Sequence, residues 1–250
     1  MRYVVAITGA SGAAYGIRLL EELPGEKILV VSETAKSIIP AETGMSYEEV
    51  CAKADRVLED SDLFGCIASG SYRCDAMIVA PCSESSVAKY ACGIADTLIS
   101  RAVSVCIKEN RKLVLMVRET PKSAIMLENE LKLARLGVTI LDANPGFYPR
   151  PQTVEDVIDI VVGRCLDQLG VEHSLYKKWE RSLLPEGDDR EDVHPLPEEY
   201  GVPDPLYRGH TGALPETGLY PARSYPELLG LQLHHYGSDG AVLYPYIGHP

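Results

Sequence analysis

The 250-residue sequence has no histidine before residue 173, no CxxC pair and no apolar run near the ~20 residues that a membrane span requires. The seven cysteines stand apart from one another and from any histidine, so we expect free thiols in a reducing cytosol and no metal site. An apolar strand pattern begins directly after Met1, without a signal-peptide pattern. These absences predict a cytoplasmic protein with no membrane span.

Positive charge is also scarce, and lysine is absent after Lys178. The net charge of −12 argues against nucleic acid as a partner. Residues 179–250 contain 12 acidic residues and four arginines, together with 10 of the 17 prolines and 7 of the 14 tyrosines. The change in composition predicts a globular body over residues 1–178 and an acidic extension over 179–250, which we expect to be an arm rather than a domain.

Short continuous apolar runs alternate with helical patterns along the body. The runs predict strands at 2–8, 27–32, 76–81, 112–117 and 138–142, and the periodic segments predict helices at 13–23, 34–42, 47–59, 84–92, 97–109, 123–136 and 153–169. Continuous apolar strands are typical of a parallel sheet that is covered on both faces. The pattern therefore predicts an α/β fold, a three-layer doubly wound parallel sheet of the Rossmann or flavodoxin-like kind.

The first strand runs into TGASGAAYG, residues 8–16, a glycine-rich turn before a helix. Its glycines have the spacing GxxGxxxG instead of the dinucleotide fingerprint GxGxxG. A short-chain dehydrogenase would also need a tyrosine four residues before a lysine, and this sequence has no such pair. What remains is a turn whose amides and Ser11 hydroxyl, at a helix N-terminus, suit an anion or the edge of a flavin.

Hydroxyl and carboxyl side chains follow the next two strands as well. Ser32 opens a helix, and Ser83 and Ser85 open another after Pro81. Each serine has an ordinary alternative as a helix N-cap, and Glu42 has one as a surface residue. Ligands of open α/β sheets bind at the carboxyl ends of strands, so we keep all four as candidate site residues.

Arg118 and Glu119 interrupt the chain directly after the buried run LVLMV. Charges at the end of a buried strand are costly unless they are paired or used. A structural ion pair is one interpretation. The other is a working pair, in which the arginine binds phosphate and the glutamate handles protons.

Further cations and a tyrosine stand on the elements around these strands. Arg101 and Lys108 lie seven residues apart on a predicted helix, so they share a face, as either a solvated stripe or a site for two anions. Tyr148 lies between prolines in the rigid segment NPGFYPRPQT. Arg164 lies at the rim of the last helix's apolar stripe, where snorkelling would also explain it.

Taken together, these motifs resemble the flavin prenyltransferase family, whose members are UbiX in bacteria and Pad1 in yeast. The resemblance covers about residues 2–180 and rests on TGASGAAYGIRLL, ASGSY, PCS, ADTLISRAVSVCIKENRKLVLMVRETP, LGVTIL and PGFYPRPQTVEDVIDIVVGRCLDQLG. It implies a metal-independent transferase that joins a dimethylallyl group from dimethylallyl phosphate to N5 and C6 of reduced FMN. The product would be prenylated FMN for a UbiD-like decarboxylase, and the enzyme would be a homo-oligomer, a dodecamer with active sites at subunit interfaces.

The resemblance also assigns roles to residues by matching motifs. It assigns contacts with FMN to Gly9, Ala10, Ser11, Ser32, Ser83, Ser85 and Arg101. It assigns the prenyl phosphate to Lys108, Arg118, Tyr148 and Arg164, and catalysis to Ser11, Glu42 and Glu119.

Two features depart from the family pattern. Leu63 stands near a position that is often aromatic and lines the prenyl pocket, and the acidic extension has no recognised counterpart, so it would brace the assembly or dock a decarboxylase. Two other functions stay open. One is an FMN-dependent cysteine decarboxylase, which we expect to need a histidine in the body. The other is a non-catalytic FMN-binding accessory subunit of a decarboxylase.

Overall fold

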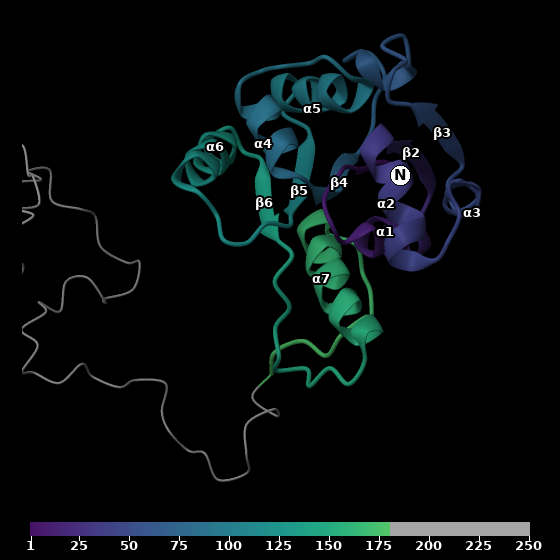
Figure 1. Ribbon diagram of the computed structural model, residues 1–250, viewed down its shortest axis with the longest axis vertical. Coiled ribbons are helices and arrows are strands. Elements are labelled where there is room, and N and C mark those ends of the chain that lie inside the picture. Colours follow the sequence, from purple (N-terminus) through teal and green to yellow (C-terminus); the bar gives the residue numbers. More distant parts are fainter. Residues whose placement is uncertain (181–250) are drawn as a thin grey trace, which may run out of the picture. The chain divides into compact units, whose positions relative to one another are not determined.

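The computed structural model describes residues 1–180 and shows a sheet flanked by helices (Figure 1). The strands are β1 (Arg2–Ile7), β2 (Glu26–Val31), β3 (Arg56–Glu59), β4 (Ala76–Cys82), β5 (Lys112–Val117) and β6 (Thr139–Asp142). The helices are α1 (Ala13–Glu22), α2 (Glu33–Thr43), α3 (Tyr47–Cys51), α4 (Glu84–Ala91), α5 (Leu98–Lys108), α6 (Ala124–Arg135) and α7 (Val154–Leu169), with a short 3₁₀ helix η1 (Cys66–Ala68). Beyond Glu180, the predicted extension lies outside the described residues.

The six strands form one parallel sheet in the order β3-β2-β1-β4-β5-β6. Val5 of β1, for example, pairs with Leu29 of β2 on one side and with Ile78 of β4 on the other. The chain thus leaves β1 in one direction and returns to its other side at β4. This is the strand order of the Rossmann fold, in which ligands bind beyond the carboxyl ends of the strands where the order reverses. The predicted doubly wound α/β fold is confirmed.

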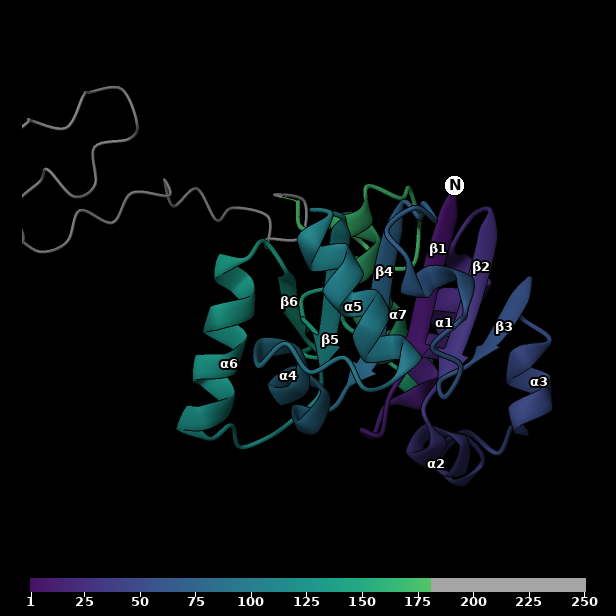
Figure 2. The same cartoon turned by 90° about the horizontal axis from the view of Figure 1, so that it is seen from above.

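The two faces of the sheet are both buried, which explains why its strands are continuously apolar. Tyr3, Val5 and Ile7 belong to the core beneath α1, α2 and α7, while Val4 and Ala6 belong to the core beneath α4, α5 and α6. Figure 2 shows the strands side by side between these two helix layers. Because the helices cover the two faces of the sheet, the carboxyl ends of the central strands stay open at one end of the three-layer body.

One predicted element is wrong. The expected helix over 47–59 ends at Cys51, and β3 then forms the edge of the sheet. Asp55 starts the pairing, because its side chain accepts a hydrogen bond from the Lys27 amide at 2.7 Å. β3 has a neighbour on one side only and exposes most of its side chains, so it lacks the continuous apolar run by which the other strands are recognised.

Gly16 sets the distance between α1 and the sheet. A Cβ atom at this position would lie 2.3 Å from the Ala80 carbonyl oxygen and 2.8 Å from Cγ1 of Ile7. The glycine therefore allows the helix that follows the first turn to pack directly over β1 and β4.

We expect Gly16→Ala to lower the free energy of unfolding by about 2 kcal/mol, because the overlap with backbone outweighs the gain in helix propensity of about 1 kcal/mol. Urea denaturation measures the change. Gly16 lies within α1 and has no positive φ, so an alanine there meets the packing overlap without backbone strain. Wild-type or higher stability of Gly16→Ala would contradict close packing at this position.

Candidate active site at the ends of β1 and β4

The loops that follow β1 and β4 are joined by Thr8. Its hydroxyl donates to the Pro81 carbonyl at 2.8 Å and accepts from the Ser83 amide at 2.9 Å, while its own amide donates to Pro81 at 3.2 Å. Thr8 is only 3% exposed. The glycine-rich turn and the PCS segment are therefore held as one unit at the point where the strand order reverses.

A pocket of about 300 Å³ opens beside this unit. Its wall is rich in hydroxyl groups, and it includes the residues Thr8, Gly9, Ser32, Thr34, Asp60, Ser83, Ser85, Ser86, Lys89, Tyr90, Thr97, Ile99 and Ser100. Ser32, Ser83 and Thr97 are the N-caps of α2, α4 and α5, so three helix N-termini meet here. Free amides and positive helix ends at one pocket suit an anionic, hydrogen-bonding ligand such as a flavin mononucleotide.

Ser11 and Glu42 meet above the first turn of α1. The Glu42 carboxylate accepts hydrogen bonds from the amides of Gly12 at 2.8 Å and Ala13 at 3.1 Å, and from the Ser11 hydroxyl. Burial pushes the pKa of the Glu42 carboxyl upward, but these hydrogen bonds and the charge of Arg118 outweigh it and hold the pKa below its ordinary value. Glu42 is thus an ionised cap of α1 next to the glycine-rich turn.

Arg118 and Glu119 follow directly after β5, the strand that lies next to β4 in the sheet. The Arg118 Nε is buried and has no hydrogen-bond partner among the described residues. Oε1 of Glu119 accepts from the Thr120 amide at 3.0 Å. Within residues 1–180 the two side chains form no ion pair, so the structural interpretation of this pair is not supported. A buried guanidinium nitrogen that lacks an acceptor fits an anion such as phosphate.

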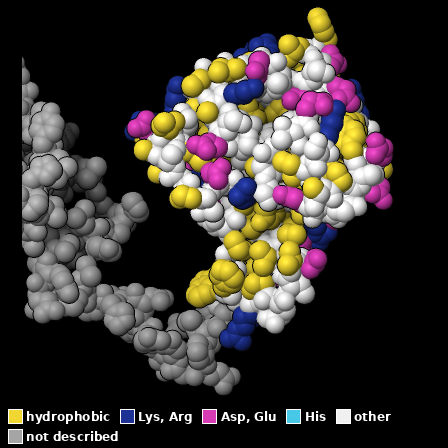
Figure 3. All heavy atoms as spheres, in the orientation of Figure 1, with side chains coloured by type: hydrophobic (Ala, Val, Ile, Leu, Met, Phe, Trp, Pro, Cys, Tyr) yellow, Lys and Arg dark blue, Asp and Glu magenta, His cyan; other side chains and the backbone are white. Residues whose placement is uncertain are grey.

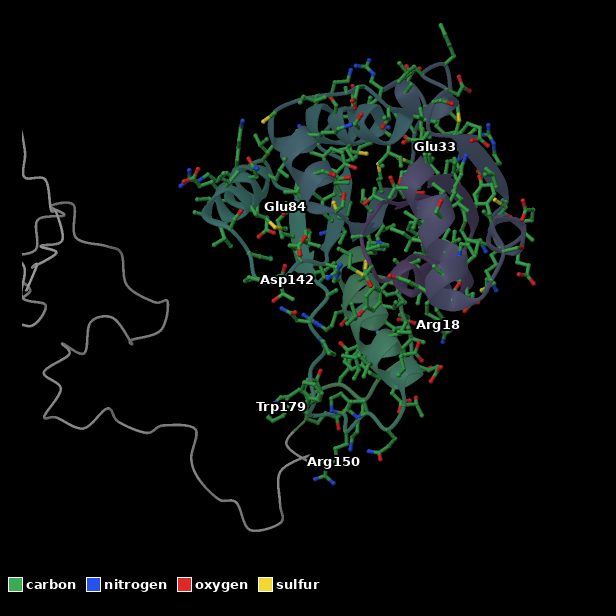
Figure 4. All side chains as sticks on the ribbon, in the orientation of Figure 1. Arg18, Glu33, Glu84, Asp142, Arg150 and Trp179 are labelled. Carbon is green, nitrogen blue, oxygen red and sulfur yellow. The ribbon has the colours of Figure 1, made fainter. Side chains whose placement is uncertain are left out.

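The loop that carries these two residues is anchored by Lys122. Its ammonium group bridges Glu130 of α6, at 3.0 Å, and Asp142 at the end of β6, which is labelled in Figure 4. The Glu130 side chain is 10% exposed and the Lys122 side chain 17% exposed. Because one cation serves two carboxylates from different elements, the segment after Arg118 is tied to both α6 and β6.

Arg101 and Lys108 have different surroundings although both lie on α5. The Arg101 Nε donates to the Ala68 carbonyl of η1 at 3.0 Å, which links it to the ASGSY segment. Lys108 lies 3.4 Å from the Glu109 carboxylate and lines a separate pocket of about 360 Å³ between α4, α5 and α6. Neither side chain lines the hydroxyl-rich pocket of its own chain.

Tyr148 and Arg164 come together at α7. The Tyr148 ring makes edge contacts with Tyr176 at 6.5 Å and with Trp179 at 5.3 Å between ring centroids. Arg164 forms an ion pair with Asp167 at 2.9 Å, and Asp167 also accepts a hydrogen bond from the Tyr176 hydroxyl. The two predicted phosphate ligands are thus linked through Tyr176.

Two further findings concern the described residues only. No three His, Cys, Asp or Glu side chains of residues 1–180 are grouped so that they could hold a metal ion. No helix in this part of the chain is long and apolar enough to cross a membrane.

Comparison with known proteins identifies the family. A family model described as Flavoprotein matches residues 1–166. A probable UbiX-like flavin prenyltransferase from Streptomyces sp. (strain D7) is 47% identical over 183 residues, which are 72% of this chain and 92% of the relative. The chain belongs to the flavin prenyltransferase family.

Solved structures related to this flavin prenyltransferase chain share its fold. A dodecameric FMN-dependent UbiX-like decarboxylase from Escherichia coli O157:H7 has a TM-score of 0.70 and 46% identity, and the match covers 72% of this chain and 100% of that one. AnUbiX (PadA1) in complex with FMN and dimethylallyl pyrophosphate has a TM-score of 0.70 and 42% identity, with 72% and 97% covered. The expected resemblance to the family is confirmed over the α/β body.

Sequence reasoning missed several residues of the hydroxyl-rich pocket. Thr8 stood in the motif, but its bond to Pro81 depends on a contact 73 residues away. Asp60, whose carboxylate accepts from the Ile99 amide at 2.8 Å, follows a segment that was interpreted as helix. Ser86 was detectable, because a hydroxyl three residues after the Ser83 N-cap faces it; the two oxygens lie 2.9 Å apart.

The lowered pKa of Glu42 makes its contribution to stability depend on pH. A carboxyl whose pKa falls on folding stabilises the protein above its unfolded pKa, and this stabilisation is lost as the pH falls through the lower folded value. We therefore expect Glu42→Gln to be less stable than the wild type by about 0.5 kcal/mol near neutral pH, since solvent screens this exposed charge, with the difference closing well below the ordinary carboxyl pKa of 4.5. Urea unfolding of both proteins over this pH range measures it. A difference that is independent of pH would contradict an ionised Glu42 at α1.

Proposed function

We propose that this chain is a flavin prenyltransferase that joins a dimethylallyl group from dimethylallyl phosphate to reduced FMN. The observation that carries the proposal is the buried Nε of Arg118, which has no hydrogen-bond partner among the described residues. The charge of Arg118 acts on Glu42, which holds Ser11, and the hydroxyl-rich pocket lies at the same carboxyl ends of the strands. The pocket fits the flavin, and the arginine fits the phosphate of a second substrate. The dimethylallyl pyrophosphate and FMN bound by AnUbiX support this pair of substrates.

The cations act on the departing phosphate. When the carbon–oxygen bond of an allylic phosphate breaks, negative charge grows on the phosphate while the allyl group becomes positive. Arg118, Lys108 and Arg164 would stabilise the phosphate, and the Tyr148 hydroxyl would donate a hydrogen bond to it. Reduced FMN supplies the N5 and C6 atoms to which the dimethylallyl group is joined.

The carboxylates handle protons. Oε1 of Glu119 accepts a hydrogen bond from the Thr120 amide, which leaves Oε2 to accept a proton released during ring closure. Glu42 holds the Ser11 hydroxyl by a hydrogen bond and so orients it at the glycine-rich turn. We assign catalysis to Glu119, Glu42 and Ser11, and FMN binding to Gly9, Ala10, Ser11, Ser32, Ser83, Ser85 and Arg101.

A homo-oligomer would bring the separated cations to one site. Lys108 lines the pocket between α4, α5 and α6, whereas Ser32 and Ser83 line the hydroxyl-rich pocket. A neighbouring copy that presents this surface to the hydroxyl-rich pocket would add its lysine to the phosphate site. The dodecameric assembly of the Escherichia coli relative supports a dodecamer for this chain.

The product would serve a UbiD-like decarboxylase, to which prenylated FMN would be passed. The seven cysteines are all free thiols, which supports the proposal of a cytoplasmic location. For residues 179–250 we propose a role as an arm that braces the assembly or docks the decarboxylase.

The decisive experiment mixes the full-length protein anaerobically with reduced FMN and dimethylallyl monophosphate or diphosphate, and follows the flavin by mass spectrometry. We expect a mass increase of one dimethylallyl group with at least one donor. Unchanged FMN, under conditions in which a known flavin prenyltransferase converts it, would support a non-catalytic FMN-binding subunit instead.

Glu119→Gln tests the proton acceptor. We expect FMN affinity within about twofold of the wild type and turnover lower by at least about 100-fold, since general-base groups contribute roughly 10²- to 10⁴-fold. Glu128→Gln, an exposed position on α6, is the matched control and is expected to be fully active. Wild-type turnover by Glu119→Gln would remove this residue from the mechanism.

A further inference from the structure

The segment that follows α7 folds back onto the helix at Gly163. A Cβ at this position would lie 2.6 Å from the Tyr176 ring and 2.7 Å from Cε1 of His173. The glycine thus admits the two rings against the helix, one residue before Arg164. In Figure 3 hydrophobic side chains gather on the surface over α7.

Asp167 is the centre of a polar network in this segment. Its Oδ2 accepts from the Tyr176 hydroxyl at 2.6 Å and from Nη1 of Arg164 at 2.9 Å, so both donors share one oxygen. Its Oδ1 lies 3.2 Å from Nε2 of His173 and 3.4 Å from the Lys178 ammonium group. Burial pushes the pKa of the Asp167 carboxyl upward, but the hydrogen bonds from these side chains outweigh it and hold the pKa below its ordinary value.

The imidazole of His173 belongs to the same network around Asp167. Its Nδ1 accepts from the Leu175 amide at 3.2 Å, which leaves Nε2 to carry the proton and donate to Asp167. The His173 side chain is 2% exposed. The turn that carries Tyr176 is therefore locked to α7 by a buried hydrogen bond.

Tyr176 contacts both predicted phosphate ligands. Its hydroxyl shares an Asp167 oxygen with Arg164, and its ring meets Tyr148 edge-on at an interplanar angle of 74°. Trp179, labelled in Figure 4, also meets the Tyr148 ring edge-on, at an interplanar angle of 89°. Arg164 comes from a helix and Tyr148 from a loop, and one side chain connects them.

We propose that Tyr176 is a positioning residue that holds Arg164 and Tyr148 in the arrangement that binds the phosphate of the prenyl donor. This inference rests on the proposed function. Asp167 accepts one hydrogen bond from the Arg164 guanidinium, at Nη1, and Tyr176 also hydrogen-bonds this side chain, so the N–H groups that neither partner uses would bind the phosphate. The ring of Tyr176 fixes the Tyr148 ring, and its hydroxyl sets the position of Asp167.

Tyr176→Phe removes the hydroxyl and keeps the ring, and Tyr176→Leu removes both. Binding of dimethylallyl monophosphate to full-length protein loaded with oxidised FMN, measured by calorimetry, reports on the donor site without turnover. We expect the dissociation constant to rise about tenfold in Tyr176→Phe and further in Tyr176→Leu, because a hydrogen bond to a charged group is lost. FMN affinity should stay unchanged, and with turnover the Michaelis constant for the donor should rise more than kcat falls.

Lys177→Ala is the matched control, since this exposed neighbour makes none of the network's contacts, and we expect wild-type donor binding. Donor affinity at the wild-type level in folded Tyr176→Phe and Tyr176→Leu, or equal losses of donor and FMN affinity, would overturn the inference. Wild-type protein that binds no dimethylallyl phosphate would overturn it as well. If the wild type binds the donor in a Tyr176-dependent way but forms no prenylated FMN, the positioning role stands and the proposed transferase activity fails.

Discussion

The site depends on one buried threonine that joins the two strands between which the sheet order reverses. Thr8 binds the Pro81 carbonyl and the Ser83 amide, so the glycine-rich turn and the N-terminus of α4 cannot move independently. Both partners are backbone groups at the end of a fully buried strand, where an unmade hydrogen bond is costly. The bridge thereby sets the positions of the glycine-rich turn and of the Ser83 cap, which form part of the pocket wall.

The geometry separates two tasks within one chain. The ends of β1, β2 and β4 contribute small residues, hydroxyls and helix N-termini, which suit a flat, polar, anionic flavin. The predicted phosphate ligands Lys108, Arg118 and Arg164 stand outside this pocket, on α5, directly after β5 and on α7. A reaction in which a phosphate departs beside a flavin needs both sets in one place, which explains why a homo-oligomer fits the proposed chemistry better than an isolated chain.

The sequence was most informative where burial is greatest. Five strands were predicted because each is an uninterrupted apolar run, and the serines that open α2 and α4 stand directly after two of them. The edge strand β3 was missed because the exposed residues Arg56 and Val57 do not form such a run. Thr8 and Tyr176 could not be assigned, because their roles depend on partners that folding brings close. The composition of a motif cannot show which backbone oxygen a hydroxyl will meet.

The central claim is that the Thr8 bridge builds the FMN pocket, and titration of FMN against Thr8→Val and Thr8→Ser tests it most directly. Valine keeps the shape of threonine and removes the hydroxyl, which leaves the Pro81 carbonyl and the Ser83 amide without this partner, whereas serine retains it. We expect Thr8→Val to bind FMN at least about tenfold more weakly and Thr8→Ser to stay near the wild type. FMN affinity at the wild-type level in folded Thr8→Val would contradict it.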